Sequence, residues 1–575
     1  MVFVSPAWAP SLPDLPDSIT LEEFINNPAH GRRPFASSRN PYTCGLTGLS
    51  RTAAHVARRT NLLARAIGKR LAFSPNQGTA WDRVVAIYSL NTIDYVPLTH
   101  AIHRLSGIVT PASAAYSALE LEHQLRSSGV KAIFTCLPLL DNARAAARAV
   151  AIPDDCIFLL PLPGQPASSL ITIDHLVAEG ETLPPVEPLK WTKGQGARQT
   201  AYLSYSSGTS GLPKAVMISH HNVIANITQL CLGDAAPRKQ LGIQTQVGLG
   251  VLPFSHIYGL VMVALIAHYR GDETVVLPQF DLDAVLAAVE RFRIEQLSVV
   301  PPMLIQIIAN RDKCAKYHLG SIRWVFCGAA PLGIEVMERL RELYPKWTLG
   351  QGYGMTEASP CIVCSIETDC LAGSSGSLIP GTRAKLIDAQ GNEVTQHETR
   401  GELLVQSPSV VLGYLNNEQA NAETFVWDDD GRWLKTGDEL LVRKSPQGHE
   451  HFIVTDRIKE LIKVKGNQVA PAELEAHLLA HPFVSDCTVI PIPDDLAGEV
   501  PKAFVVKAPD ANAHPDADVT AAICKHVEDH KARYKWLKGG VEFIDAVPKS
   551  PTGKILRRLL KDKEAQARKA KGAKL

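Results

Sequence analysis

Short runs of β-branched and aromatic residues recur along the chain from about residue 85, and segments with helical spacing of apolar residues separate them. The runs are VVAIYSL (84–90), GIVTP (107–111), KAIFTCL (131–137), TVVLPQF (274–280), QLSVVPP (296–302) and RWVFCGA (323–329). Such runs predict buried strands, whereas PLGIEVMERLRELYP (331–345) is typical of an amphipathic helix. The alternation predicts an α/β fold of layered, largely parallel sheets.

The pattern changes between about residues 374 and 455, where turn signals flank short strand-like runs. KLIDAQGNEV (385–394) and WDDDGRW (427–433) predict hairpins and therefore a β-rich subdomain. Beyond residue 460, strand-like CTVIPIP, KAFVVKA and VEFIDAV alternate with a helical pattern from about Val519 and a basic C-terminal helix. We predict an N-terminal domain over 1–455, a hinge at 456–459 and a small, mobile α+β domain over 460–575.

Composition narrows the class of protein. A chain of 575 residues is too long for one hydrophobic core, and 45% hydrophobic with 20% charged residues is ordinary for a globular protein. The net charge of +1 gives no global field toward nucleic acid or an acidic membrane, so a small-molecule substrate fits better.

The cysteines and the ends of the chain bear on the compartment. The 11 cysteines are odd in number and irregularly spaced, which favours reduced thiols in an intracellular compartment. Cys361 and Cys364 lack a second pair at zinc-site spacing, so we interpret them as structural. The N-terminus has no signal-peptide pattern, and the apolar segment 259–267 is too short to span a bilayer.

The stretch SSGTSGLPKAV (206–216) has the composition of a loop that binds phosphate. Its glycines allow several backbone N–H groups to point at one anion, and its hydroxyls and Lys214 add donors. It is not a Walker A loop, because Ala215 follows the lysine where that motif needs Ser or Thr. A predicted strand precedes the loop and a helix-like segment follows it.

Six further blocks follow in order: LPFSHIYGL (252–260), GAAPL (328–332), QGYGMTEASP (351–360), LKTGDE (434–439), DRIKELIKVKGNQVAPAELE (456–475) and PKSPTGKILRRLL (548–560). With the glycine-rich loop, they resemble the adenylate-forming superfamily, which includes acyl-CoA synthetases and 4-coumarate-CoA ligases. The resemblance covers roughly residues 50 to 560. It implies ATP-dependent ligation of a carboxylic acid to coenzyme A through an acyl-adenylate, with release of AMP and pyrophosphate.

The resemblance assigns a nucleotide site. It implies that Tyr353 stacks on adenine between glycines that let the purine approach, that Asp438 with help from Arg457 binds the ribose hydroxyls, and that Lys554 reaches the α-phosphate. Thr209 and Glu357 match the magnesium ligands, since hydroxyl and carboxylate oxygens suit that ion. The positions that match nucleotide-binding residues are Ser206, Ser207, Gly208, Thr209, Ser210, Gly211, Lys214, Ala330, Gln351, Gly352, Tyr353, Gly354, Thr356, Asp438, Arg457 and Lys554.

Other positions match the family's second half-reaction, in which the small domain rotates about a hinge and CoA attacks the adenylate. Lys459 matches the hinge residue. Lys463 and Gln468 resemble residues that support thioester formation, and Lys465 and Gly466 match positions that contact CoA.

The acid pocket departs from that of 4-coumarate ligases. His256, Tyr258 and Ala329 match positions beside the acyl group. Met262 stands in place of a serine, Phe326 of a lysine and Cys361 of a valine, so polar groups are lost from the pocket. We therefore expect an apolar fatty or aryl acid, resembling cinnamate or phenylacetate, rather than a hydroxylated ring.

Alternatives remain open at this point. A free-standing adenylation enzyme that loads a carrier protein is one, although FSHIYG has no Asp to bind an α-amino group. An inactive nucleotide-binding scaffold is another, although Lys554, Glu357, Asp438 and Lys459 are all present. The C-terminal Ala573-Lys574-Leu575 is a close variant of the peroxisomal Ser-Lys-Leu signal, so we expect a peroxisomal import receptor as partner and a peroxisomal location, with cytoplasm as the alternative.

Overall fold

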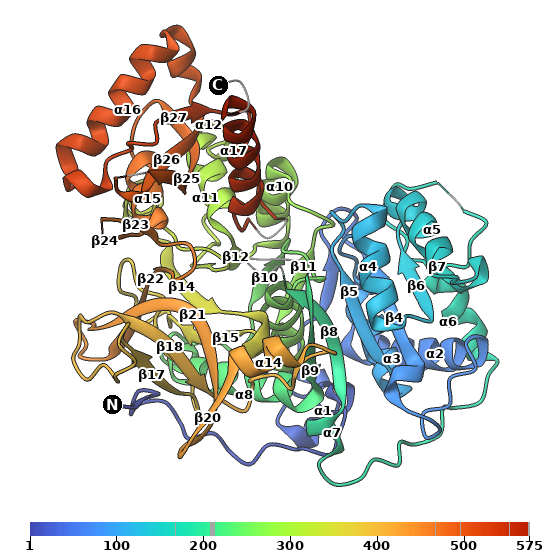
Figure 1. Ribbon diagram of the computed structural model, residues 1–575. Coiled ribbons are helices and arrows are strands. Elements are labelled where there is room, and N and C mark those ends of the chain that lie inside the picture. The colour runs from blue at the N-terminus through green and yellow to red at the C-terminus, as the bar shows by residue number, and fades with distance from the viewer. Residues whose placement is uncertain (167, 207–212, 466, 495, 551–552, 573–575) are drawn as a thin grey trace.

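The computed structural model describes all residues except 167, 207–212, 466, 495, 551–552 and 573–575, and gives no side chains for 569–572. In the described chain, three sheets build a large N-terminal domain and a fourth builds a smaller C-terminal domain above it (Figure 1). This arrangement confirms the predicted α/β fold with a large and a small domain.

A seven-stranded sheet has the order β19-β9-β8-β5-β4-β6-β7, and its strands β4, β5, β6 and β7 lie in the lobe drawn in blue and cyan (Figure 1). Alternate residues of its central strand face different layers: Val84 and Ala86 belong to one buried cluster, Val85 and Ile87 to another. The sheet is therefore covered on both faces, as a mainly parallel sheet requires. The strands are β4 (Val84–Tyr88), β5 (Ile108–Ala112), β6 (Ala132–Thr135), β7 (Ile157–Leu159), β8 (Thr200–Ser206), β9 (Lys214–Ser219) and β19 (Gly413–Tyr414).

Helices cover both faces of this lobe. On one face α4 (Ala118–Ser128) packs on α5 (Leu140–Ala149), and on the other α2 (Ala53–Arg70) packs on α3 (Tyr95–Arg104) and α6 (Ile173–Glu181). The long α8 (His220–Gln240) starts where the Ser219 hydroxyl accepts from the Asn222 N–H, an N-cap that satisfies an otherwise unpaired donor.

A nine-stranded sheet forms the centre of the molecule, in the order β16-β15-β14-β13-β12-β10-β11-β2-β3. Its strands from β14 across to β2 run parallel, and pairing becomes antiparallel at both edges. The strands are β2 (Tyr42–Cys44), β3 (Ser50–Arg51), β10 (Val247–Gly250), β11 (Glu273–Val276), β12 (Gln296–Val299), β13 (Trp324–Cys327), β14 (Thr348–Gly354), β15 (Cys361–Cys364) and β16 (Ser377–Leu378).

Helical segments connect these strands. They are a π-helix η6 (Tyr258–Leu265) that leads into α9 (Ile266–Arg270), then α10 (Leu282–Phe292), α11 (Pro301–Ala309), α12 (Arg311–Cys314) and α13 (Ile334–Leu343). The short helices α1 (Leu21–Asn26), α7 (Gln195–Arg198) and α14 (Glu418–Thr424) lie elsewhere in the large domain.

The β-rich region is an antiparallel sheet in the order β1-β17-β18-β21-β20, with β22 on β21, and the N-terminal strand β1 closes one edge. The hairpin predicted from 385–394 begins with β17, and the hairpin predicted from 427–433 joins β20 to β21. Both predictions are confirmed. The strands are β1 (Phe3–Val4), β17 (Arg383–Ile387), β18 (Gly401–Gln406), β20 (Phe425–Asp428), β21 (Gly431–Lys444) and β22 (Glu450–Arg457).

The C-terminal domain has its own sheet and hydrophobic core. Its elements are β23 (Ile462–Val464), β24 (Asn467–Val469), α15 (Pro471–Leu479), β25 (Val484–Asp494), β26 (Gly498–Lys507), α16 (Asp516–His530), β27 (Val541–Phe543) and α17 (Arg557–Gly572). The buried clusters of the two domains separate between Phe452 and Ile462, while β22 continues to Arg457. The boundary at 455/456 and the hinge at 456–459 stay predictions.

Two further observations concern thiols and membranes. All 11 cysteines are free thiols, in accordance with the prediction of reduced cysteines. Within the described residues, no helix has both the length and the apolar character needed to cross a bilayer.

Candidate active site

Tyr353, Asp438 and Arg457 meet at the end of the central sheet that faces the C-terminal domain. The Tyr353 hydroxyl donates to Asp438 Oδ2 at 2.7 Å, and Arg457 Nε lies 3.5 Å from Asp438 Oδ1. The pairing of β21 with β22 sets Asp438 opposite Arg457. Burial raises the pKa of Asp438, and Arg457 and the Tyr353 hydrogen bond oppose that rise. The structure thus brings together the three residues predicted for adenine and ribose.

The glycines beside Tyr353 are required by the protein's own packing. A Cβ at Gly352 would lie 2.4 Å from Phe326 Cζ, and one at Gly354 would lie 2.1 Å from the Pro360 carbonyl oxygen. Neither contact is possible for a real side chain. Phe326 and Pro360 therefore occupy the space beside these glycines that we expected a purine to approach. Adenine contact at the two glycines stays a prediction.

Gln351 positions the GAAPL segment. Its buried side chain accepts a hydrogen bond from the Leu332 N–H at 2.9 Å, so it reaches this loop across the sheet edge. Within the loop, Ala329 is exposed at φ +67° and Ala330 is half-buried. Gln351 thus fixes the position of the GAAPL segment at Leu332.

The predicted magnesium end is partly described. Glu357 is 5% exposed and follows Thr356 in a short 3-10 turn. Its Oε1 accepts from the Tyr414 hydroxyl at 2.8 Å, while the Lys214 ammonium lies 4.9 Å from the Tyr414 ring centroid. Tyr414 was missed by sequence reasoning, because strand pairing between β19 and β9 creates this contact 57 residues away.

Most of the glycine-rich loop lies outside the described residues. Ser206 and Lys214 pair across β8 and β9 and define the two ends of the loop. Ser207, Gly208, Thr209, Ser210 and Gly211 lie outside the description, as do Gly466 and the tail Ala573, Lys574 and Leu575.

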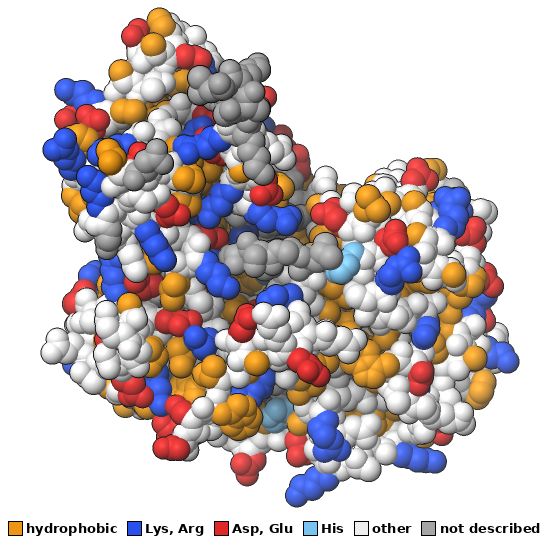
Figure 2. Space-filling model, in the orientation of Figure 1, with side chains coloured by type: hydrophobic (Ala, Val, Ile, Leu, Met, Phe, Trp, Pro, Cys, Tyr) orange, Lys and Arg blue, Asp and Glu red, His pale blue; other side chains and the backbone are white. Residues whose placement is uncertain are grey.

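Lys554 reaches this site from the C-terminal domain. Burial lowers the pKa of Lys554 to about 8; Arg457 adds to the fall, and the carboxylates of Glu460, Asp438 and Glu357 oppose it. Gly553 brings its turn against the large domain, because a Cβ there would lie 3.2 Å from Val300. Figure 2 shows Lys and Arg side chains bordering the recess between the two domains.

A chain of ion pairs continues from Asp438 into the small domain. Arg457 Nη1 lies 3.4 Å from Glu460, Arg557 also pairs with Glu460, and Arg557 Nη2 lies 2.6 Å from Glu475. The exposed Lys459, predicted as the hinge residue, lies between Arg457 and Glu460 in sequence. Sequence reasoning missed Glu460, Glu475 and Arg557, which hold the segment around the hinge in this arrangement.

The residues predicted for thioester formation lie on the β23–β24 hairpin. Lys463 is paired with Gln468 across it, and Lys463, Lys465 and Gln468 are all exposed. In the described part of the chain, no hydrogen bond or ion pair joins these side chains to the Tyr353 and Asp438 site.

The residues predicted for the acid pocket lie on η6, β13, β15 and the adjoining loops. His256 and Tyr258 precede and begin the π-helix, and the Tyr258 hydroxyl donates to the Phe326 carbonyl at 3.3 Å. Burial, with Lys554 nearby, lowers the pKa of His256 to about 4, so its imidazole is neutral at pH 7. Met262 and Phe326 line a cavity whose described wall does not include His256 or Tyr258. Cys361 is buried, with its thiol donating to the Val363 carbonyl, and it does not line this cavity.

The chain matches two family models. The AMP-binding enzyme model matches residues 50–415, and the AMP-binding enzyme C-terminal domain model matches residues 473–554. Among curated proteins, the acyl-CoA ligase AKT1 of Alternaria alternata is 40% identical over 98% of this chain and 97% of its own. The acyl-CoA ligase easD of Emericella nidulans is 37% identical over 98% of this chain and all of its own length.

Solved structures share the fold at lower identity. The anthranilate CoA ligase AuaEII in complex with anthranoyl-AMP superimposes with a TM-score of 0.79 at 22% identity, covering 96% of this chain and 98% of its own. ATP-bound MatB from Rhodopseudomonas palustris gives a TM-score of 0.76 at 23% identity, covering 95% and 99%.

Proposed function

This chain belongs to the AMP-binding enzyme family, and we propose that this AMP-forming acid-CoA ligase is selective for a fatty or aryl acid with an apolar body. The acid carboxylate attacks the α-phosphorus of ATP, giving an acyl-adenylate and pyrophosphate. The CoA thiol then attacks the acyl carbon, giving the thioester and AMP. The observation that carries the ligase chemistry is the burial of Lys554 close to Asp438 and Glu357, and the apolar choice of acid is supported by the cavity that Met262 and Phe326 line.

We propose that Lys554 stabilises the first transition state. Negative charge builds on the oxygens of the α-phosphate as the carboxylate attacks, and a buried cation held there interacts more strongly with that charge than water would. The Tyr353 hydroxyl holds Asp438, and Arg457 neutralises part of its charge, which supports a fixed carboxylate for the ribose. His256, neutral at pH 7, adds no competing charge beside the acid.

Glu357 fits the predicted magnesium role. One of its oxygens accepts from Tyr414, and within the described residues the other accepts no hydrogen bond. A buried carboxylate oriented in this way is a suitable hard ligand for Mg²⁺, which neutralises the pyrophosphate leaving group when bound.

The second half-reaction requires a different domain arrangement. We propose that rotation about Lys459 withdraws Lys554 and turns the hairpin with Lys463, Lys465 and Gln468 toward the adenylate. The exposure of that hairpin supports the proposal. The rotation must break the ion pairs that link Asp438 through Arg457 to Glu460. These ion pairs therefore stabilise the present arrangement of the two domains.

The experiment incubates pure protein with ATP, Mg²⁺, CoA and a panel of fatty, cinnamic, phenylacetic and amino acids, and identifies products by mass spectrometry. Lys554→Ala should abolish acyl-adenylate and acyl-CoA formation, whereas Lys538→Ala, at an exposed lysine, should not. Accumulation of acyl-AMP without acyl-CoA for every acid would refute CoA as the acceptor and favour a carrier protein. Products restricted to amino acids would refute the apolar substrate.

We propose a peroxisomal location on the basis of the C-terminal sequence Ala573-Lys574-Leu575. A fluorescent protein fused to the N-terminus of the chain should enter peroxisomes. A matched fusion without the last three residues should remain in the cytoplasm. Equal distribution of the two fusions would contradict the proposal.

A further inference from the structure

The cavity behind Met262 and Phe326 changes character along its length. Near those residues its wall is apolar and includes Ile266, Trp324 and Leu378. Toward the start of β10 and β12, away from the strand ends that carry the nucleotide site, the same cavity is lined by Asp234, Arg238, Arg270, Gln246 and Gln296, together with Glu367, and Trp8 from the N-terminal segment also lines it. A purely apolar acid would leave that polar end unmatched.

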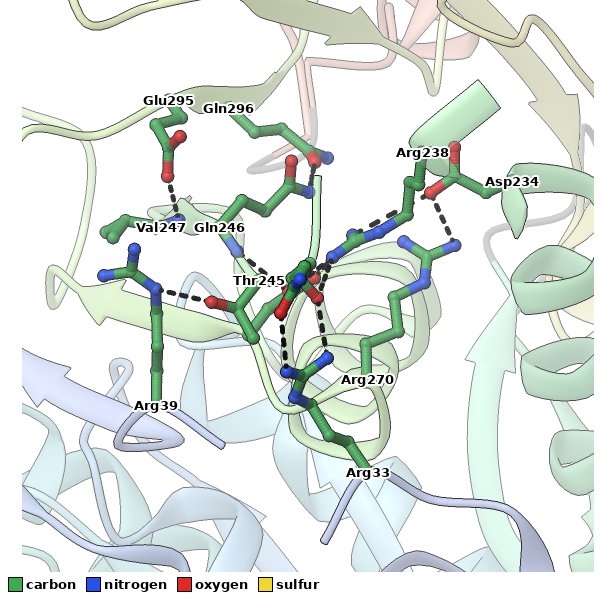
Figure 3. A network of polar contacts seen from close by, with 12 residues as sticks. Arg33, Arg39, Asp234, Arg238, Thr245, Gln246, Val247, Arg270, Glu295 and Gln296 are labelled. Atoms are coloured by element: carbon green, nitrogen blue, oxygen red, sulfur yellow. Dashed lines mark hydrogen bonds and ion pairs between the residues drawn. The ribbon is translucent and has the colours of Figure 1, made fainter. Parts of the chain in front are cut away.

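The charges at the polar end are balanced within the protein. Arg238 binds both carboxylate oxygens of Asp272 at 2.8 Å, and Arg270 lies 3.1 Å from Asp234. Figure 3 shows how Arg238, Asp234 and Arg270 face one another in this network. Since each guanidinium already has a carboxylate partner, the cavity offers no uncompensated cation for an anionic ligand.

A further ion pair extends the same network, because the Gln246 N–H donates to Asp272. Arg323 pairs with Glu367 and also donates to the Gln246 amide oxygen at 2.7 Å. The Gln246 amide in turn donates to Gln296, whose own amide donates to Ser298. These amides are therefore occupied with one another, which makes this side of the wall polar but already satisfied.

Two polar atoms in the cavity wall have no partner in the described chain. The indole N–H of Trp8 is buried and donates to nothing. Asp234 interacts with Arg270 and Arg238 through Oδ2, and within the described chain its Oδ1 accepts no hydrogen bond. The side chain is 28% accessible and lines the cavity. A buried donor left unpaired costs about 1–3 kcal/mol, so the Trp8 N–H indicates a missing partner, and the accessible Oδ1 of Asp234 offers an acceptor in the wall of the same cavity.

We propose that the far end of this cavity binds a hydroxyl group on the tail of the acid, accepting from Trp8 Nε1 and donating to Asp234. The inference rests on the proposed function and narrows its substrate to an apolar acid with a distal neutral hydroxyl. A methyl terminus would leave both groups unpaired. A second carboxylate would be repelled by Asp234 and Glu367.

The test compares straight-chain acids that differ only at the far end, with methyl, hydroxyl or carboxylate, over a series of lengths. In the wild type, kcat/KM for the best hydroxyl acid should exceed that of its methyl counterpart by roughly 10- to 100-fold. Trp8→Phe should reduce that ratio about tenfold by removing the N–H donor, and Asp234→Asn should reduce it as well. Trp427→Phe, at an indole on a 74% exposed residue, should leave the ratio unchanged.

A methyl acid used as well as the hydroxyl acid, or a ratio unchanged in Trp8→Phe, would overturn the inference, with a water molecule as the partner instead. A preference for the dicarboxylic acid would also overturn it. If no acid gave acyl-CoA, the proposed function would fail. Calorimetric binding of the hydroxyl and methyl acids to wild type and Trp8→Phe would still decide the inference.

A separate observation concerns three histidines of the C-terminal domain. His526 and His530 lie one helical turn apart on α16, and His477 on α15 stacks against His526 at 4.1 Å between ring centroids. Each of the three rings offers one nitrogen atom, and these three atoms all lie within 4.8 Å of one another. Two histidines at i and i+4 with a third from a neighbouring helix form a common arrangement for a transition metal.

Backbone carbonyls determine which ring nitrogens carry protons. His477 and His526 each donate from Nε2 to the other's carbonyl at 3.1 Å, and His530 donates from Nδ1 to the His526 carbonyl at 2.9 Å. Because a carbonyl only accepts, each ring keeps a lone pair on its other nitrogen. Carbonyl support of this kind is typical of metal-binding histidines.

We infer a binding site for a divalent transition cation such as Zn²⁺, with His477, His526 and His530 as ligands. A bound ion would join α15 to α16. Calorimetry with ZnCl₂ should show one site, and the melting temperature should rise with Zn²⁺. His526→Ala should abolish both effects, and His318→Ala, at an 89% exposed histidine, should preserve them. An unchanged Zn²⁺ response in His526→Ala, or no binding to the wild type, would overturn the site.

Discussion

The charge state of Lys554 should make adenylation fall with rising pH in a range where most lysines do not titrate. Burial and Arg457 lower the pKa of Lys554 from 10.5 to about 8. A group with that pKa is about 90% cationic at pH 7 and about 10% at pH 9. If the cation is required, kcat/KM for the first step should therefore fall about tenfold between those two values.

The assay is pyrophosphate exchange into ATP across this pH range. It uses kcat/KM because that quantity reports the pKa values of the free enzyme. Lys554→Arg should be slower but should lose the fall, since a guanidinium stays protonated throughout. The titration of Lys554 does not destabilise the fold as the pH rises, so unfolding caused by this lysine cannot explain the expected loss of activity. Its folded pKa lies below its unfolded one, so the unfolded state holds more protons between pH 8 and 10.5, and stability rises with pH there.

A flat wild-type profile would refute this reasoning. The same fall in Lys554→Arg would also refute it, because another group would then be responsible. The profile thus separates a catalytic cation from a lysine that only holds the two domains together.

Three other predictions follow from contacts in the large domain. Tyr414→Phe removes the donor that orients Glu357, and should raise the Mg²⁺ concentration for half-maximal pyrophosphate exchange about tenfold. Gly354→Ala places a Cβ 2.1 Å from the Pro360 carbonyl oxygen, and should cost about 1–3 kcal/mol or more in urea unfolding. Burial lowers the pKa of His268 to about 3, so the unfolded state takes up protons below pH 6.5, and unfolding free energy should drop by about 2 kcal/mol by pH 5.

The first two of these predictions have matched controls. Tyr317→Phe, whose hydroxyl makes no hydrogen bond within the described chain, should leave the Mg²⁺ dependence unchanged, and an equal effect would remove the role of Tyr414. Gly320→Ala, where a Cβ meets nothing within 4 Å, should be nearly neutral. An unfolding free energy equal at pH 7 and pH 5 would contradict the burial of a neutral His268.

The pattern of apolar residues predicted strands well where it involves only neighbouring positions of the chain. The strands expected near 84–90, 131–137 and 323–329 are present as β4, β6 and β13, because β-branched runs suit a sheet covered on both faces. Contacts between distant segments were not predictable in this way. Tyr414 reaches Glu357 only because β19 pairs with β9.

The acid pocket illustrates the limit most clearly. Three substitutions, Met262, Phe326 and Cys361, predicted an apolar pocket, and Met262 and Phe326 do line the apolar part of the cavity. The polar end depends on Asp234 and Trp8, which belong to α8 and to the first residues of the chain. Neither lies in a motif, so their approach to the cavity was not visible in the sequence.

The sequence by itself determined the family and the alternation of helices and strands, and it predicted the nucleotide-site residues, because motifs and periodicity act over a few neighbouring positions. Only the tertiary structure decided which side chains come together: Lys554 lies near Asp438 across two domains, Tyr414 donates to Glu357, and Trp8 and Asp234 line one cavity. The physical reason is that burial, charge compensation and unpaired hydrogen-bonding atoms are properties of packed surroundings, which segments far apart in the chain create together.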